Sequence, residues 1–209
     1  MTQPMRRKEF TIGEQQEIEQ FLHEVSYGHL GMIGEDGWPH IVALNFVYVE
    51  GHFYVHGSKI GEKMRLLGSD PRVTFSVAKE YAIIPSYFSD PKLACPATAF
   101  FKSVLARGRA ILVEDLHEKA RAFSAFMSKL QPEGGYDEID PADDEYRKNL
   151  LGVALIRLDV EDLSAKFKFG QNLTEPRREK LIHNLQDRNQ NLDAETIELM
   201  KKYCPAHKE

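Results

Sequence analysis

Cysteine is almost absent from this chain, because Cys95 and Cys204 are the only two among 209 residues. Two thiols so far apart form neither the ligand spacing of a metal site nor the disulfide framework of a small secreted domain. The opening segment MTQPMRRKEF is charged and has no apolar core of the kind a secretory signal needs. We therefore expect a cytoplasmic protein.

Long apolar runs and an excess of positive charge are also missing. No stretch approaches the roughly 18 apolar residues of a membrane-spanning helix, so no membrane association is expected. The 32 acidic and 27 basic residues give a net charge of -5, which makes nucleic acid an unlikely partner. The hydrophobic content of 42% is sufficient for one sizeable core. We expect a single domain over residues 1–209.

Signals for metal-dependent or hydrolytic chemistry are lacking as well. The eight histidines are scattered, and no two of them lie four residues apart on an expected helix, the arrangement that typifies zinc peptidases. His52 and His56 have that spacing but lie in a β-rich run. No serine lies in a G-x-S-x-G motif, so a hydrolase is not indicated. The sequence therefore predicts no metal site and no protein nucleophile.

Strand-like alternation dominates the middle of the chain. Three β-rich runs, 29–34, 40–49 and 52–56, are separated by Asp36-Gly37 and Glu50-Gly51, which are typical turn pairs. Further β-rich runs follow at 72–77, 100–113 and 151–169. The strands do not alternate regularly with helices, which favours an antiparallel barrel over a doubly wound sheet. We predict a mainly β protein with helices packed outside the barrel.

Helices are predicted at a few well-marked places. Thr11 and Glu14 have the spacing of a capping box, which predicts a helix from there to about Val25. Asp115 and Glu118 repeat this pairing before an apolar stripe that ends near Gly134-Gly135. Three more helices are expected: one at about 61–67, one after Thr174 with Pro176 in its first turn, and one from Asp193 to before Pro205. The last two form a C-terminal helical extension, about 174–205.

Two segments are expected to be loops. Residues 83–96 contain three prolines and a Ser-Asp-Pro turn, which do not suit a strand. Residues 137–145 concentrate acidic side chains around Pro141, and such a charge run is usually solvated. We predict a mobile acidic loop there.

A possible phosphate site lies where the strand ending at His56 meets the helix expected from Gly61. Between them stand Gly57, Ser58 and Lys59, and Lys63 falls in the first helical turn. Backbone amides at a helix start, a hydroxyl and lysines suit a phosphate. An ordinary strand-to-helix turn with solvated lysines remains the alternative.

Two other strands carry polar side chains at alternating positions. Lys102 and Ser103 lie on opposite faces of one strand, and Ser103 can bond a ligand or be a satisfied core hydroxyl. Lys166 and Lys168 share one face near the end of another strand, with Phe167 and Phe169 on the other. This pair of cations can receive an anionic ligand or the partner subunit. Alternatively, it protects a solvated sheet edge against aggregation.

In their order along the chain, these stretches resemble the pyridoxamine 5'-phosphate oxidase-like FMN-binding split barrels, including the nitroimidazole-resistance and flavin-nucleotide-binding branch. The resemblance covers about Met5 to Lys168. It rests on the leading Met-Arg-Arg-Lys and on the following stretches: Pro39–Tyr48, Phe53–Ser58, Gly61–Lys63, Asp70–Phe75, and Lys102-Ser103-Val104 ahead of Gly108. The segment from Lys166 to Asn172 is similar to a branch named as negative transcriptional regulators.

The resemblance implies an FMN cofactor bound at a homodimer interface. It places Val42, Ala43, Leu44 and Asn45 along the flavin ring, and His56, Gly57, Ser58 and Lys63 towards the ribityl phosphate. Lys102 and Ser103 would complete the pocket. The implied activity is that of a flavin reductase-like oxidoreductase acting on a small molecule.

The resemblance departs from the oxidase archetype at the C-terminus, where this chain has no tryptophan and arginine motif. Its only tryptophan is Trp38, in a predicted turn. Two alternatives to an enzyme stay open. One is a non-catalytic module that binds flavin or haem, with His56 or Cys95 as conceivable iron ligands. The other is a transcription-linked regulator that uses the basic C-terminal segment.

Overall fold

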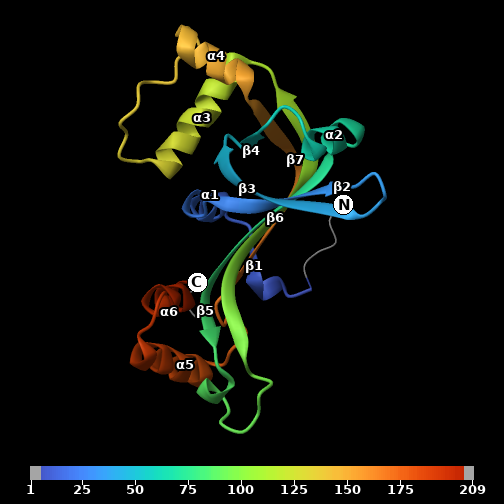
Figure 1. Cartoon of the computed structure of the whole chain (residues 1–209). Coiled ribbons are helices and arrows are strands. Elements are labelled where there is room, and N and C mark those ends of the chain that lie inside the picture. The colour runs from blue at the N-terminus through green and yellow to red at the C-terminus, as the bar shows by residue number, and fades with distance from the viewer. Residues whose placement is uncertain (1–5, 205–209) are drawn as a thin grey trace. The chain divides into compact units, whose positions relative to one another are not determined.

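The computed structural model describes residues 6–204, which group into two compact units. Three strands contribute residues to both units: β5 (Arg72–Ile84), β6 (Thr98–Val113) and β7 (Ala154–Lys168), which are labelled in Figure 1. We call them the barrel unit, which consists of residues 14–77 and 104–164, and the terminal unit, which consists of residues 6–13, 78–103 and 165–204. The expectation of a single domain stays a prediction.

Seven strands form one sheet that closes on itself. They are β1 (Thr11–Ile12), β2 (Tyr27–Ile33), β3 (Pro39–Val49), β4 (His52–Gly57), β5 (Arg72–Ile84), β6 (Thr98–Val113) and β7 (Ala154–Lys168). Their order is β1-β7-β4-β3-β2-β5-β6, and β6 also pairs with β7. The pairs β2–β3, β2–β5, β3–β4 and β4–β7 are antiparallel. The predicted antiparallel barrel is confirmed.

The barrel closes where β6 meets β7, at Gly108. A Cβ atom on this glycine would lie 1.9 Å from the carbonyl oxygen of Asp159, far inside van der Waals contact. Ion pairs flank the approach, with Arg107 Nη2 3.0 Å from Asp162 Oδ2 and Arg109 Nε 3.0 Å from Glu161 Oε1. Only glycine lets the two backbones come this close.

In the described part of the chain, residues 6–204, six α-helices accompany the sheet. They are α1 (Gln15–Glu24), α2 (Glu62–Ser69), α3 (Leu116–Leu130), α4 (Asp144–Gly152), α5 (Glu175–Arg188) and α6 (Asp193–Lys202), with short 3-10 turns η1 (Lys8–Phe10) and η2 (Ser86–Phe88). The Asp115 side chain accepts from the Glu118 amide at 2.6 Å, so the predicted cap of α3 is confirmed. Within residues 6–204, every helix is too short or too polar to cross a membrane.

Two predictions were wrong in part: the helix expected up to about Val25 is present as α1 and residues 137–143 lie outside helices and strands, but the cap of the first and the end of the second differ. Thr11 does not cap a helix; it lies in β1, opposite Lys166 of β7, and α1 begins four residues later. The acidic segment 137–145 is not entirely a loop, because the Asp143 carboxylate caps α4 by accepting from the amides of Glu145 and Tyr146 at 3.0 and 2.9 Å. An acidic side chain at this position accepts hydrogen bonds from the first amides of a helix. The number of charges in the segment does not reveal this role.

The loop predicted for 83–96 begins slightly later than expected. Strand β5 continues to Ile84, seven residues beyond the predicted end at Val77. The extension is buried at Tyr81, Ala82 and Ile84. It therefore belongs to the core of the terminal unit, where packing decides the strand length.

The interior of the barrel is filled by aromatic side chains. Phe46 of β3, Phe53 of β4 and Phe75 of β5 are at most 1% exposed, and their ring centroids lie 5.2–5.8 Å apart. The amphipathic helix α3 adds a second cluster, in which Phe126 and Ala122 pack against Val47, Tyr54, Val113 and Leu155. No space remains inside the barrel for a ligand as large as a flavin.

The terminal unit has its own aromatic core. Phe169 lies 5.3 Å from Tyr81, 6.1 Å from Phe100 and 5.7 Å from Tyr203, measured between ring centroids. Helices α5 and α6 pack side by side (Figure 1). The turn between them is fixed by Arg188, whose guanidinium donates to the buried carboxylate of Asp193.

A lysine ties α3 to two other elements of the barrel unit. The Lys129 ammonium donates to the carbonyls of Leu22 in α1 and Phe46 in β3, at 2.9 and 3.1 Å, and lies 4.0 Å from the Phe46 ring centroid. Burial lowers the pKa of Lys129 from 10.5 to about 8. The charged form therefore carries a desolvation cost in the folded protein.

This shift predicts a pH dependence of stability. Between about pH 8 and pH 10.5 the unfolded chain keeps a proton that folded Lys129 has lost, so the free energy of unfolding should rise with pH. Below about pH 8 both states hold the proton and this contribution is flat. Urea unfolding at about pH 7 and about pH 9.5 should show the rise in the wild type and in the Lys148→Met control on α4. Lys129→Met should show a smaller rise, because the lowered pKa values of Lys63 and Lys168 remain. A rise as large as that of the wild type would contradict the assignment.

Candidate functional site

The turn between β4 and α2 has the features of an anion cradle. The Ser58 hydroxyl accepts from the Ile60 amide at 3.2 Å and shapes the turn. Gly61 precedes the helix with φ 112°, a value that favours glycine, and its position provides no side chain to cap α2. The first amides of α2 are therefore donors that an anion can accept from.

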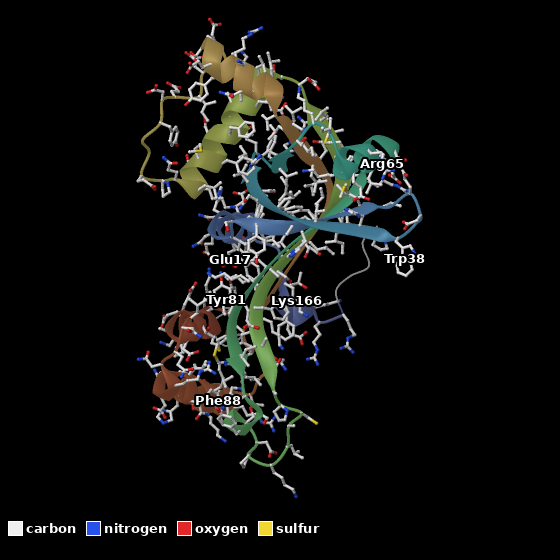
Figure 2. The ribbon with its side chains drawn as sticks, in the orientation of Figure 1. Glu17, Trp38, Arg65, Tyr81, Phe88 and Lys166 are labelled. Carbon is white, nitrogen blue, oxygen red and sulfur yellow. The ribbon has the colours of Figure 1, made fainter. Side chains whose placement is uncertain are left out.

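Lys63 directs its ammonium towards this turn. A Cβ atom on Gly57 would lie 2.8 Å from Lys63 Nζ, so the lysine head sits against the end of β4. The side chain is half-buried, and burial lowers its pKa. Within residues 6–204, the ammonium has no hydrogen-bond or ion-pair partner. Its neighbour Arg65 (Figure 2), by contrast, forms an ion pair with Glu35.

His56 is close to Lys63 but is not a cation. Burial, and secondarily the charge of Lys63, lower the pKa of His56, so its imidazole is neutral at pH 7. Its ring packs on α3, with centroids 4.9 Å from Phe126 and 5.5 Å from Phe123. His56 can therefore orient a ligand by a hydrogen bond, but it adds no charge for a phosphate.

The four candidate residues of β3 divide between two faces of the sheet. Val42 lies opposite the buried Leu30 and belongs, with Leu44, to the inner face. Ala43 and Asn45 belong to the exposed outer face. The Asn45 side-chain amide donates to the Ser26 carbonyl at 3.0 Å. A ligand on the outer face would contact Ala43, Asn45 and the backbone of Val42 and Leu44.

Apolar side chains are exposed on the same outer face. Tyr27 and Ile33 of β2 and Ile41 of β3 are 54%, 41% and 64% exposed. The pairing of β2 with β3 places them on the face that carries Ala43 and Asn45. Trp38, 75% exposed, projects from the turn between the two strands (Figure 2). An exposed apolar sheet face of this kind is typical of an interface.

The remaining two candidates, Lys102 and Ser103, belong to the terminal unit. Lys102 is 7% exposed, and its ammonium lies 5.1 Å from the Tyr81 ring centroid and 5.3 Å from that of Phe167. Ser103 is half-buried on the opposite face of β6, as the alternation predicted. A direct role for Lys102 would require access to this aromatic interior.

A partly buried charge network was not foreseen. Glu118 of α3 accepts from Arg157 Nη1 at 2.7 Å and from the Tyr54 hydroxyl at 3.0 Å, while Arg157 Nε donates to Asp159 at 2.6 Å. Burial, followed by Glu118, raises the pKa of Tyr54 to about 12. These groups pair with one another and hold α3 to the barrel wall. In the portion of the chain that the structure describes, no group of three His, Cys, Asp or Glu residues is placed to hold a metal ion.

Comparison with known proteins identifies the family. The family model described as pyridoxamine 5'-phosphate oxidase matches residues 14–167. The chain therefore belongs to this family. No curated protein matches the chain.

Solved structures share the fold at low sequence identity. A candidate 5-nitroimidazole antibiotic resistance protein from Bacteroides thetaiotaomicron superposes with a TM-score of 0.60 at 21% identity, covering 75% of this chain and 85% of that one. A flavocytochrome from Azotobacter vinelandii gives 0.64 at 22%, covering 80% and 73%. An FAD- and heme-binding protein from Mycobacterium smegmatis gives 0.60 at 15%, covering 76% and 73%.

Proposed function

We propose that this chain binds FMN between two copies of itself and acts as an oxidoreductase on a small molecule. The observation that carries the proposal is the unpaired, half-buried ammonium of Lys63 at the uncapped start of α2. Family membership and the flavin- and haem-binding proteins among the structural neighbours support it.

The residues of the turn fit a phosphate monoester. Lys63 supplies a formal charge, the first amides of α2 supply donors at the positive end of the helix dipole, and the Ser58 hydroxyl lies in the same turn. Gly57 adds no side chain where the lysine head sits. Bound FMN would supply electron transfer through its ring system, while the protein orients the ring and excludes water.

The barrel geometry supports a position of the ring outside the barrel. The interior is filled by Phe46, Phe53 and Phe75, and the outer face of β2 and β3 exposes Ala43 together with apolar side chains. One open sheet face cannot enclose a planar ring. A second copy of the chain, applied to this face, would bury Tyr27, Ile33 and Ile41 and cover the flavin.

The substrate should differ from that of the family's named oxidase. The single tryptophan, Trp38, stands in the turn between β2 and β3 and not at the C-terminus. The C-terminal helices instead cover the terminal unit. We therefore favour a flavin reductase-like activity towards a small acceptor.

FMN should bind more tightly than FAD, because the turn offers one anion cradle and the chain has no dinucleotide fingerprint. Isothermal titration of the full chain with each flavin measures both affinities. An equal affinity for FAD, or haem binding without flavin binding, would overturn the FMN assignment.

Lys63→Ala should weaken FMN binding about tenfold to hundredfold, because a hydrogen bond to a charged group contributes about 1.5–3 kcal/mol. The thermal midpoint should change little, since the ammonium has no hydrogen-bond or ion-pair partner among residues 6–204. Lys148→Ala on α4 removes the same charge from the same unit and should leave FMN affinity unchanged. An unaltered dissociation constant in Lys63→Ala would exclude this lysine from the site.

Dimer formation and FMN binding should be linked, because each is expected to cover the other's exposed surface. Sedimentation over a dilution series should show tighter association with FMN present. Ile41→Lys should weaken both association and FMN binding, whereas Leu151→Lys, which also charges an exposed apolar position, should weaken neither. A monomeric Ile41→Lys with full FMN affinity would show that one chain builds the whole pocket.

A further inference from the structure

A cavity of about 690 Å³ lies within the terminal unit. It is bordered by the segment before β1, by the loop after η2, by β6 and β7 and by α5. Its lining includes six positively charged side chains and a single carboxylate, that of Asp90. The six are Arg6, Arg7, Lys166, Lys168, Arg177 and Lys180. None of the lining residues is a candidate flavin residue.

Among the described residues that line the cavity, one carboxylate faces six cations, so most of the positive charge is uncompensated by the lining. Asp90 already accepts from the amides of Lys92 and Leu93 at 2.8 and 3.0 Å. Arg7 meets Glu9 only at 3.4 Å, with both side chains exposed, and such surface pairs are weak. An anion entering the cavity would therefore meet a net positive field.

Lys168 lies where the charges of two other cations affect it. Its ammonium donates to the Thr98 hydroxyl, a neutral partner. Burial lowers the pKa of Lys168, and the charges of Lys166 and Arg7 lower it further. A cluster of like charges in a partly buried site is unfavourable unless something of opposite charge occupies it.

The other part of the cavity wall is apolar and aromatic. Lys166 lies between two rings, 5.8 Å from the Phe10 centroid and 5.3 Å from that of Phe101. Phe100 and Leu173 extend this wall. A lining of this composition suits a molecule that has both an anionic group and an apolar ring.

An anti-aggregation role explains these lysines less well. Such a role requires a free sheet edge, but β7 is paired with β1 at Lys166, which lies opposite Thr11. The turn that follows is also specifically shaped. Gln171 is buried, accepts from the Phe169 amide at 2.7 Å and donates to the Phe167 carbonyl at 2.6 Å. These bonds fix the end of β7 and, with it, the position of Lys168.

We propose that this cavity binds a small organic anion, in which a carboxylate or phosphate is attached to an apolar ring. The cationic side chains hold the anionic group, and Phe10, Phe100 and Phe101 contact the ring. The cavity volume falls within the range of roughly 300–1,000 Å³ for small-molecule sites. This ligand is additional to FMN, so the proposal does not depend on flavin binding.

The test is isothermal titration of the full chain, saturated with FMN if it binds FMN, with two probes. One is 1-naphthoate, an aromatic carboxylate, and the other is 1-naphthylmethanol, its uncharged counterpart. We expect 1-naphthoate to bind at least about tenfold more tightly, as a charge-assisted hydrogen bond implies. Equal binding of the two probes would overturn the proposal.

Variants locate the binding. Lys166→Gln with Lys168→Gln should weaken 1-naphthoate binding about tenfold or more, while Lys166→Arg with Lys168→Arg should retain it. Lys92→Gln with Lys201→Gln removes two exposed lysines that do not line the cavity and should leave binding unchanged. Circular dichroism and the thermal midpoint check that each variant folds.

Three results would contradict the proposal of a ligand site separate from the flavin site. Unchanged 1-naphthoate binding in the glutamine variant would place the probe elsewhere. Loss of 1-naphthoate binding on FMN saturation would make the cavity part of the flavin site. If the glutamine variant became monomeric and the arginine variant bound no 1-naphthoate, the cations would belong to the subunit interface. Absence of FMN binding would contradict the proposed function alone.

Discussion

The close approach of β6 to β7 at Gly108 is the constraint on which the barrel depends. A side chain at this position would collide with the Asp159 carbonyl. Without the pairing of β6 with β7, the seven strands would form an open sheet with free edges. Closure leaves an interior in which Phe46, Phe53 and Phe75 are buried and pack against one another. A flavin bound to the barrel unit would therefore lie on an outer face or in a turn, where the candidate residues of β3 and of the turn between β4 and α2 stand.

Much of this fold could be predicted from local pattern. Alternation and two glycine-containing turns give β2, β3 and β4 to within two residues, and Asp115 with Glu118 marks the start of α3. The failures arise where distant segments decide. Thr11 looks like a helix cap but pairs with Lys166, some 150 residues away in the chain. Strand β5 extends to Ile84 because Tyr81 and Ile84 are buried by parts of the terminal unit that no local pattern identifies.

Local pattern also predicted part of the candidate site. Gly57, Ser58 and Lys63 are neighbours in sequence, so one turn brings them together. Alternation along β3 assigns Val42 and Leu44 to one face of the sheet and Ala43 and Asn45 to the other. It does not show which of the two faces is exposed. Alternation placed Lys166 and Lys168 on one face, yet it could not show that Arg7 would lie near Lys168. Burial of Lys102 among aromatic rings was likewise beyond a local reading.

The interleaving of the two units limits how the chain can be divided. Their boundaries fall within β5, β6 and β7, at residues 77–78, 103–104 and 164–165. Each unit is therefore assembled from separated stretches of sequence, and no single cut releases one of them whole. Proteolysis or gene truncation at any of these points would sever a strand. Insertions and fusions are better tolerated in connections that lie within one unit, such as the segment between α3 and α4.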